Sequence, residues 1–172
     1  MKFSTRARYG LRMMVELARE LQHSRLVQLG RIAEITHLSV NYLVQLAIPL
    51  KNNGLIVGIS GKKGGYRLAR PPREIKIREI LEAVQGPLSL SDCVNNPEIC
   101  LNSSFCEARM IWVLASQKII DVFEEYSLAD LIDREYKNKI RNKYPGITLL
   151  DPDKFMAAND SGRDYPAGKI KL

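Results

Sequence analysis

The sequence lacks the features that mark membrane-spanning proteins, secreted proteins and most enzymes. No apolar run approaches the roughly 20 residues needed to cross a bilayer. Near the amino terminus, Arg6, Arg8, Arg12 and Glu16 interrupt every apolar stretch, which argues against a secretory signal. No internal repeat is present, and no paired acid and base or activated nucleophile stands out. We therefore expect a cytoplasmic protein that is not an enzyme and has no membrane partner.

Positive charge is concentrated in the first half of the chain. The net charge is +7, but residues 1–90 hold 15 Lys or Arg against 6 Asp or Glu, whereas residues 91–172 hold 11 against 13. A basic surface of this kind can bind nucleic acid or an acidic membrane. No segment has the pattern of a lipid-binding amphipathic helix with exposed large apolar groups, so nucleic acid is the better candidate partner.

Hydrophobic spacing and capping residues predict a mainly helical fold with one small β-hairpin. Ser4 or Thr5, Ser39 and Ser127 can each cap a helix. Pro49 falls inside the third helix, where its missing N–H predicts a kink or early unwinding, at a cost of about 3 kcal/mol in a regular helix. The predicted helices cover residues 5–21, 29–35, 40–52, 77–84, 107–126 and 128–136, and the predicted strands cover 55–59 and 66–69.

Two helices, a tight turn, a capped third helix and a glycine-rich hairpin together indicate a winged helix-turn-helix. The amino end of such a recognition helix meets base edges in the major groove of DNA. Here that end presents Ser39, Val40, Asn41, Tyr42 and Gln45 as candidate DNA contacts. These residues could instead only solvate an exposed face, but the order of elements and the charge together favour DNA binding.

Specific roles follow from the chemistry of these side chains. Asn41 and Gln45 carry amides that can bind adenine with two hydrogen bonds, and Ser39 can contact a phosphate while it caps the helix. Glycines in the hairpin loop leave little steric obstruction, so its lysines can approach phosphates or a minor groove. The loop is not a P-loop, because no strand–GxxxxGK–helix context surrounds it. The remaining candidate contacts, in the hairpin loop and on the first helix, are Lys62, Lys63, Gly64 and Arg8.

The only cysteines, Cys93, Cys100 and Cys106, lie in one short polar segment with the spacing C-x6-C-x5-C. An odd number of thiols cannot close into a full set of internal disulfides. Structural cysteines are usually buried in a core, whereas thiolates grouped in a loop suit a soft metal centre, above all iron–sulfur or zinc. The alternative is a redox-reactive loop that binds no metal. We favour a metal centre.

The long helix predicted over residues 107–126 has an unusually broad apolar surface. Such a surface must be covered either by the chain's own core or by the same helix of a second subunit. The sequence thus divides into four parts. These are a winged helix-turn-helix over residues 1–87, a cysteine loop over 88–106, a dimerisation helix and last helix over 107–140, and a flexible tail over 141–172.

The chain resembles the iron–sulfur cluster regulator (IscR-like) family of winged-helix transcription regulators over about residues 1–135. This resemblance implies a homodimeric bacterial repressor or activator whose long helices pair. It also implies that Cys93, Cys100 and Cys106 hold a 2Fe–2S or 4Fe–4S cluster that reports iron–sulfur, iron, nitric-oxide or redox status. The match runs through MKFSTRARYG (1–10), LSVNYLVQL (38–46), KNNGL (51–55), GKKGGY (61–66), ILEAVQGP (80–87), the three cysteines and SLADL (127–131).

The chain departs from the family pattern at several positions. Arg109 stands where some relatives have a histidine ligand, and Arg8 stands where others supply a carboxylate from the partner's first helix. The fourth ligand is therefore open, with Glu107 as one candidate. Val44 replaces a glutamate of a familiar member, so that member's base preference does not transfer. Ser60 replaces an arginine that often precedes the wing glycines.

We therefore expect a homodimeric regulator that binds a pseudo-palindromic double-stranded DNA operator and senses its signal through a cluster bound by three cysteines. One alternative within transcription is a repressor responding to redox state or cysteine metabolism through its thiols, without a cluster. An alternative from another class is a zinc-stabilised interaction module that uses the basic face to bind a protein or RNA.

Overall fold

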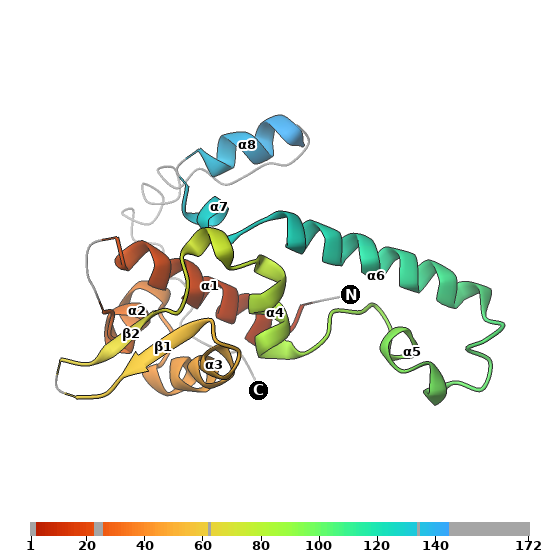
Figure 1. Cartoon of the computed structure of the whole chain (residues 1–172), viewed down its shortest axis with the longest axis horizontal. Helices are drawn as coiled ribbons and strands as arrows, with labels where there is room; N and C mark the ends of the chain where they lie inside the picture. Colours follow the sequence, from red (N-terminus) through yellow and green to blue (C-terminus); the bar gives the residue numbers. More distant parts are fainter. Residues whose placement is uncertain (1–2, 23–25, 62, 134, 145–172) are drawn as a thin grey trace, which may run out of the picture. The chain divides into compact units, whose positions relative to one another are not determined.

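The computed structural model describes residues 3–22, 26–61, 63–133 and 135–144, and the chain divides into two compact units, residues 1–133 and 134–172 (Figure 1). None of the described helices is long and apolar enough to cross a membrane. The second unit contributes helix α8 (Tyr136–Lys143). The elements of the first unit are α1 (Thr5–Glu20), α2 (Leu29–Thr36), α3 (Val40–Asn52), β1 (Ile56–Ile59), β2 (Gly65–Leu68), the 3-10 turn η1 (Pro72–Glu74), α4 (Ile77–Gln85), α5 (Asp92–Asn95), the 3-10 turn η2 (Pro97–Ile99), α6 (Glu107–Glu125) and α7 (Leu128–Ile132).

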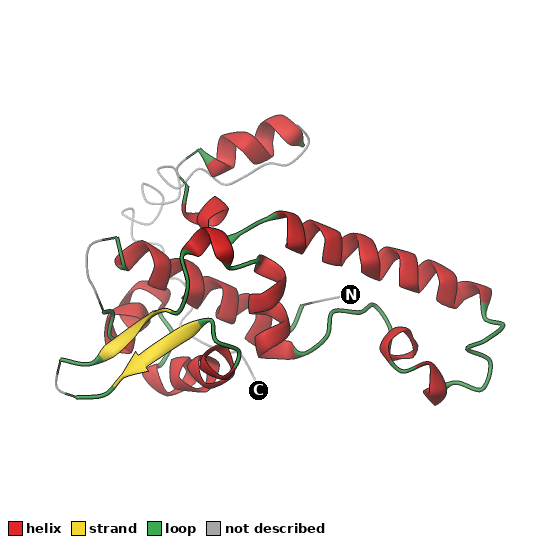
Figure 2. Ribbon diagram, in the orientation of Figure 1, coloured by secondary structure: helices red, strands yellow, loops and turns green. Residues whose placement is uncertain are grey.

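The predicted mainly helical fold with one hairpin is confirmed, as Figure 2 shows. The helix starts are fixed by the serines expected to cap them. Ser4 Oγ accepts from Ala7 N at 3.0 Å, and Ser39 Oγ accepts from Tyr42 N at 3.2 Å. Ser127 forms a reciprocal capping box with Asp130 at the start of α7. Each cap satisfies a backbone N–H that the first turn of the helix would otherwise leave without a partner.

Helix α1 lies at the centre of the first unit and packs against α2, α3, α4, α7 and β2. Its buried side chains, among them Met13, Met14 and Leu17, are fully removed from solvent. The closest approach is to α4, where a Cβ added at Gly10 would lie 3.0 Å from Val84 Cγ1. Glycine at position 10 therefore permits a tight α1–α4 packing that a larger residue would force apart.

The wing is a two-stranded antiparallel sheet in which Ile56 pairs with Leu68 and Ile59 with Gly65. A further bridge joins it to the helical core, because Val27 N donates to Tyr66 O at 2.9 Å and Tyr66 N donates to Val27 O at 2.8 Å. A Cβ at Gly65 would lie 2.8 Å from the Val27 carbonyl oxygen, so this close backbone approach requires glycine.

Two sequence expectations fail. Helix α3 does not unwind at Pro49 but continues to Asn52. Asn53 closes the helix by donating to the carbonyl oxygen of Pro49 from N at 3.0 Å and from Nδ2 at 2.9 Å. The helix expected over 128–136 instead ends at Ile132, and Asp133 has the extended backbone angles φ −66° and ψ 130°. Helix α8 then begins at Tyr136, and the tail expected from residue 141 lies outside the described residues from 145 onward.

Candidate nucleic-acid interface and cysteine loop

Helix α3 has one face in the core and one face in solvent. Leu43, Leu46, Ala47 and Leu50 are buried against the rest of the first unit. No acidic residue occurs anywhere in the helix. The exposed face carries four of the predicted DNA contacts, namely Ser39, Val40, Asn41 and Gln45, together with Val44. This arrangement leaves the amino end of α3 free to enter a groove of DNA.

Tyr42, also predicted as a DNA contact, is half-buried and has a second partner. Its ring lies edge-on to the ring of Tyr9, with the ring centroids 6.0 Å apart. Such T-shaped aromatic pairs are favourable. The pair joins α1 to the first turn of α3, so Tyr42 helps to orient the recognition helix whether or not it also touches DNA.

The basic candidates lie on two different elements. Lys63 is exposed in the loop between β1 and β2, beside Gly64, and Lys62 lies outside the described residues. Arg8 is exposed on α1, where its Nη2 lies 3.5 Å from Thr5 Oγ1 and its guanidinium lies 5.9 Å from the centre of the Tyr9 ring. Arg8 also lines an apolar cavity with Phe123 of α6. A DNA contact by Arg8 stays a prediction.

The three cysteines are free thiols distributed along the segment between α4 and α6. Cys93 is half-buried in α5, Cys100 is exposed after η2, and Cys106 is half-buried as the residue that precedes α6. Neither α5 nor η2 contributes a buried side chain to the core. The segment between Cys93 and Cys106 can therefore rearrange without disrupting the hydrophobic core.

Two hydrogen bonds attach the amino-terminal part of the segment between α4 and α6 to α6, and a third lies within that helix. Arg109 Nε donates to the carbonyl oxygen of Cys93 at 2.9 Å. Leu90 N donates to Ser116 Oγ at 3.0 Å, and Ser116 Oγ in turn donates to the carbonyl oxygen of Trp112 at 2.7 Å. Ser116 is the buried residue of α6. These contacts hold Cys93 beside the long helix whose first turn follows Cys106.

The role of Arg109 could not be read from the sequence. At that position only a missing histidine ligand was evident, because a hydrogen bond to a backbone carbonyl 16 residues away leaves no sequence pattern. Glu107 is exposed in the first turn of α6, where a negative charge is favourable. Within the described ranges, no three His, Cys, Asp or Glu side chains lie close enough together to hold a metal ion.

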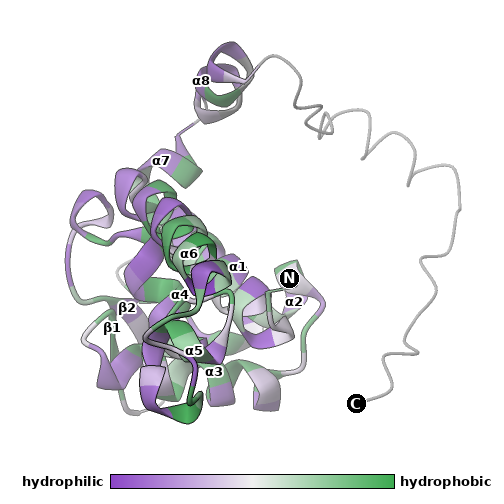
Figure 3. Ribbon diagram, turned by 90° about the vertical axis from the view of Figure 1, so that its right-hand side faces the viewer, coloured by the Kyte–Doolittle hydropathy of each residue, from purple (hydrophilic) through white to green (hydrophobic). Residues whose placement is uncertain are grey.

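The amino-terminal half of α6 presents large apolar side chains to solvent. Figure 3 shows hydrophobic residues, in green, recurring along the ribbon of this helix. In the carboxyl-terminal half Val122 is also 45% exposed, but Phe123 packs edge-on against Phe3 with the ring centroids 5.5 Å apart. The exposed apolar residues, with their exposed fractions, are Met110 (65%), Ile111 (60%), Trp112 (45%), Val113 (36%) and Leu114 (60%).

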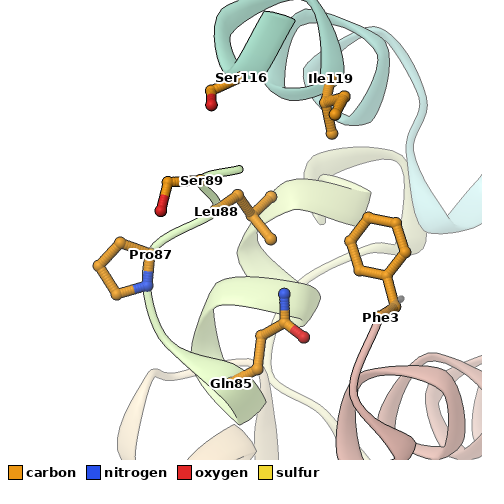
Figure 4. A pocket seen from close by; sticks show the side chains of 7 residues that line it. All are labelled: Phe3, Gln85, Pro87, Leu88, Ser89, Ser116 and Ile119. Carbon is orange, nitrogen blue, oxygen red and sulfur yellow. The ribbon is translucent and has the colours of Figure 1, made fainter. Parts of the chain in front are cut away.

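Two cavities mark the junction between α6 and the helical domain. The smaller one, of about 80 Å³, lies where the chain leaves α4, and Figure 4 shows Ser116 and Ile119 of α6 above Leu88 and Ser89. The larger one, of about 570 Å³, is lined by residues of α1, α4 and α6 together with Phe3. The cysteine segment and α6 therefore meet the domain through an incompletely filled contact.

Known proteins resemble this chain over most of its length. Residues 3–134 match the Rrf2 family, described as an iron-dependent transcriptional regulator. The HTH-type transcriptional regulator CymR of Bacillus subtilis (strain 168) is 34% identical over 131 residues, covering 76% of this chain and 89% of CymR. The HTH-type transcriptional regulator NsrR of Shouchella clausii (strain KSM-K16) is 31% identical over 136 residues, covering 78% of this chain and 91% of NsrR.

Solved structures agree with the sequence matches. The structure of CymR (YrzC), the global cysteine regulator of B. subtilis, has a TM-score of 0.63 at 32% identity and covers 77% of this chain and 96% of that chain. T. potens IscR has a TM-score of 0.61 at 28% identity, and the match covers 90% of this chain and 96% of that chain. These relatives are regulators rather than enzymes, which confirms the expected function class and the resemblance seen in the sequence. The chain belongs to the Rrf2 family of DNA-binding transcriptional regulators.

Proposed function

We propose that the protein is a homodimeric repressor or activator that reads a pseudo-palindromic operator with α3 and the wing. We further propose that it senses iron–sulfur, iron, nitric-oxide or redox status through a cluster held by Cys93, Cys100 and Cys106. The observation that carries this proposal is the placement of three free thiols on one segment attached to the apolar helix α6. The match to a family described as iron-dependent supports it.

DNA binding by α3 and the wing separates into two kinds of contact. Gln45 is exposed one turn into the helix, where an amide can bind a base edge. Lys63 is exposed in the wing loop, where its charge can reach a phosphate or the minor groove. A two-fold dimer would place its two recognition helices in half-sites about one helical turn apart, roughly 34–36 Å.

We expect Gln45→Ala to lose about 1–3 kcal/mol of discrimination at particular base pairs, because a bidentate contact is removed. Lys63→Ala should instead weaken binding to all sequences and lower the salt-dependence slope by about 1. Both effects are measurable by titrating a selected operator and its single-base variants at several salt concentrations. Asn52→Ala, which removes an exposed amide from the other end of α3, serves as the control. Unchanged base preferences in Gln45→Ala would disprove the groove assignment.

Dimerisation is supported by the exposed apolar residues at positions 110–114. An apolar patch of this kind on a helix is characteristic of an interface, and in a homodimer the same surface serves both subunits. Ile119 and Phe123, on the same helix, are half-buried against the chain's own fold. The residues that test pairing without disturbing the monomer are therefore Ile111 and Leu114, each 60% exposed.

Ile111→Asp and Leu114→Asp should each convert the dimer to a monomer and sharply reduce operator affinity. An aspartate there would place an unpaired charge in an apolar seam, which is strongly unfavourable. Sedimentation at micromolar concentration measures the change, and circular dichroism verifies that the helices remain. Ile48→Asp, on the exposed face of α3, is the matched control and should stay dimeric. A wild-type monomer that still binds its operator tightly would rule out the pairing.

The donor set fits a cluster in its chemistry. Iron–sulfur clusters are held by cysteine thiolates, and all three cysteines are free. Cys93 is attached to α6 through Arg109, and Cys106 directly precedes that helix, whereas Cys100 is exposed on a segment without buried side chains. Two donors are thus anchored and the third can move to join them. A bound cluster would supply a redox-sensitive and iron-sensitive centre, with Glu107 as one candidate for the fourth position.

Alanine at Cys93, Cys100 or Cys106 should abolish the visible absorbance of anaerobically reconstituted protein and change its operator affinity. The fold should persist, because none of the three side chains is part of the buried core. Absorbance spectra with iron and sulfide assays measure the first effect and DNA titration the second. Wild-type protein that binds neither iron nor sulfide would refute cluster sensing, whereas an unchanged Glu107→Ala spectrum would exclude only Glu107 as a ligand.

Arg109→Gln should shorten the lifetime of the cluster in air by roughly 2- to 10-fold, the range expected for one lost hydrogen bond. The substitution removes the guanidinium that donates to the Cys93 carbonyl and so releases one anchored donor. The decay of visible absorbance gives the lifetime. Arg73→Gln neutralises an exposed arginine that is ion-paired only with Glu74, and it should leave the lifetime unchanged. Equal lifetimes in the two variants would show that Arg109 does not support the site.

A cluster-free thiol switch is the second candidate, because one solved relative is described in an oxidized form. The oxidized form of Staphylococcus aureus CymR has a TM-score of 0.62 at 33% identity, covering 77% of this chain and 97% of that chain. The exposed Cys100 thiol is accessible to oxidants here. The reconstitution experiment separates the two candidates, since a thiol switch would respond to oxidant while remaining colourless.

A further inference from the structure

A row of branched apolar side chains lies exposed along the recognition helix. Val40 is 45% exposed, Val44 is 39% exposed and Ile48 is 56% exposed. Their spacing of four residues places them on one face of α3, next to one another. The buried face of the helix is formed by other residues, so this row does not serve the core. Exposed branched apolar residues that adjoin one another at successive turns of a helix form a patch of the kind found at binding surfaces.

Several observations point to DNA as that partner. The row begins at the first residue of α3, beside the amides of Asn41 and Gln45. The helix contains no acidic residue, and residues 1–90 carry 15 Lys or Arg against 6 Asp or Glu. A protein partner that covered only this patch would leave the basic charge and the amides without a role. The wing and α3 belong to the same domain, as a winged helix requires.

Of the chemical groups that the four base pairs present in the major groove, one is apolar and can pack against such side chains. The C5 methyl of thymine is the apolar group presented there, and small apolar side chains contact it. We propose that Val40 and Val44 bind thymine methyl groups and so determine sequence preference at those positions. They lie within the first two turns of α3, the part of a recognition helix that meets base edges. This inference rests on the proposed role of α3 as the groove-reading helix.

The two exposed edges of α3 then make different kinds of contact with the bases. Asn41 and Gln45 supply hydrogen bonds, which distinguish bases by their donors and acceptors, while Val40 and Val44 supply apolar contacts. Glutamate at position 44 would accept hydrogen bonds from cytosine, whereas valine can only favour a methyl group.

Uracil substitution tests the proposal, because uracil differs from thymine only by the missing C5 methyl. An operator is first selected from a random-sequence pool with the full-length dimer, and each thymine is then replaced singly by deoxyuridine. At one or two positions in each half-site we expect about fourfold weaker binding, the effect of one buried methyl group. Val40→Ala and Val44→Ala should each abolish this thymine-to-uracil ratio at one position while affinity for the uracil operator is kept.

Three further variants serve as controls for this comparison. Threonine retains a methyl group in the same position, so Val40→Thr and Val44→Thr should retain most of the ratio. Ile99→Ala truncates an exposed branched residue outside α3 and should retain all of it. Val→Ala variants that lose affinity equally for thymine and uracil operators would show a structural role and overturn the proposal. Uracil substitutions without effect at every position would also overturn it, whereas a protein that selects no operator would refute groove reading itself.

Discussion

The close packing of α1 against α4 is the constraint on which the rest of the first unit depends. At Gly10 a Cβ would lie only 3.0–3.1 Å from the two γ-carbons of Val84, so the helices approach as near as glycine permits. Helix α1 also packs on α2, α3 and α7, and α4 packs on α3 and α6. The recognition helix and the apolar helix α6 are thus positioned by the same pair. Close-packed interiors deform little, so this pair acts as a rigid mount for both.

The cysteine segment is attached more weakly than α1 is packed against α4. Leu88 is buried where the chain leaves α4, but no side chain from residue 89 to residue 106 is buried. This part is attached by the hydrogen bonds from Arg109 Nε to the Cys93 carbonyl and from Leu90 N to Ser116 Oγ. Each such bond contributes only about 0.5–1.5 kcal/mol to stability. The segment can therefore change conformation at a free-energy cost well below that of unfolding the core.

Much of this architecture could be predicted from the sequence, because its signals are local. Serine caps, glycine stops and apolar spacing depend on residues within four positions of one another, and they located α1, α3, α4 and α6 closely. What the sequence could not give depends on contacts between distant residues. The hydrogen bond from Arg109 to the Cys93 carbonyl and the Tyr9–Tyr42 pair belong to this class. The break after Ile132 was missed for a different reason, since no glycine or proline marks it.

The candidate site likewise has some features that could be predicted from the sequence and others that could not. The sequence identified the exposed end of α3 and the thiol segment, since both depend on residue type and spacing. It could not separate residues of α6 that cover their own core, such as Phe123, from those that stay exposed, such as Leu114, because both occupy apolar positions of one broad surface. Only the packing of α6 on α4 and Phe3 distinguishes them.

The close packing of α1 on α4 and the hydrogen bonds of the cysteine segment together limit how a signal could reach the operator under the proposed function. A change at the cysteines would act first on the hydrogen-bonded segment and on α6, which meet the domain beside cavities of about 80 and 570 Å³. The Gly10–Val84 contact between α1 and α4 and the buried face of α3 lack such freedom, because the side chains there are close-packed and buried. Each recognition helix would therefore keep its own shape. A signal would then alter the distance or angle between the two recognition helices of a dimer, to which a pseudo-palindromic site of fixed spacing is sensitive.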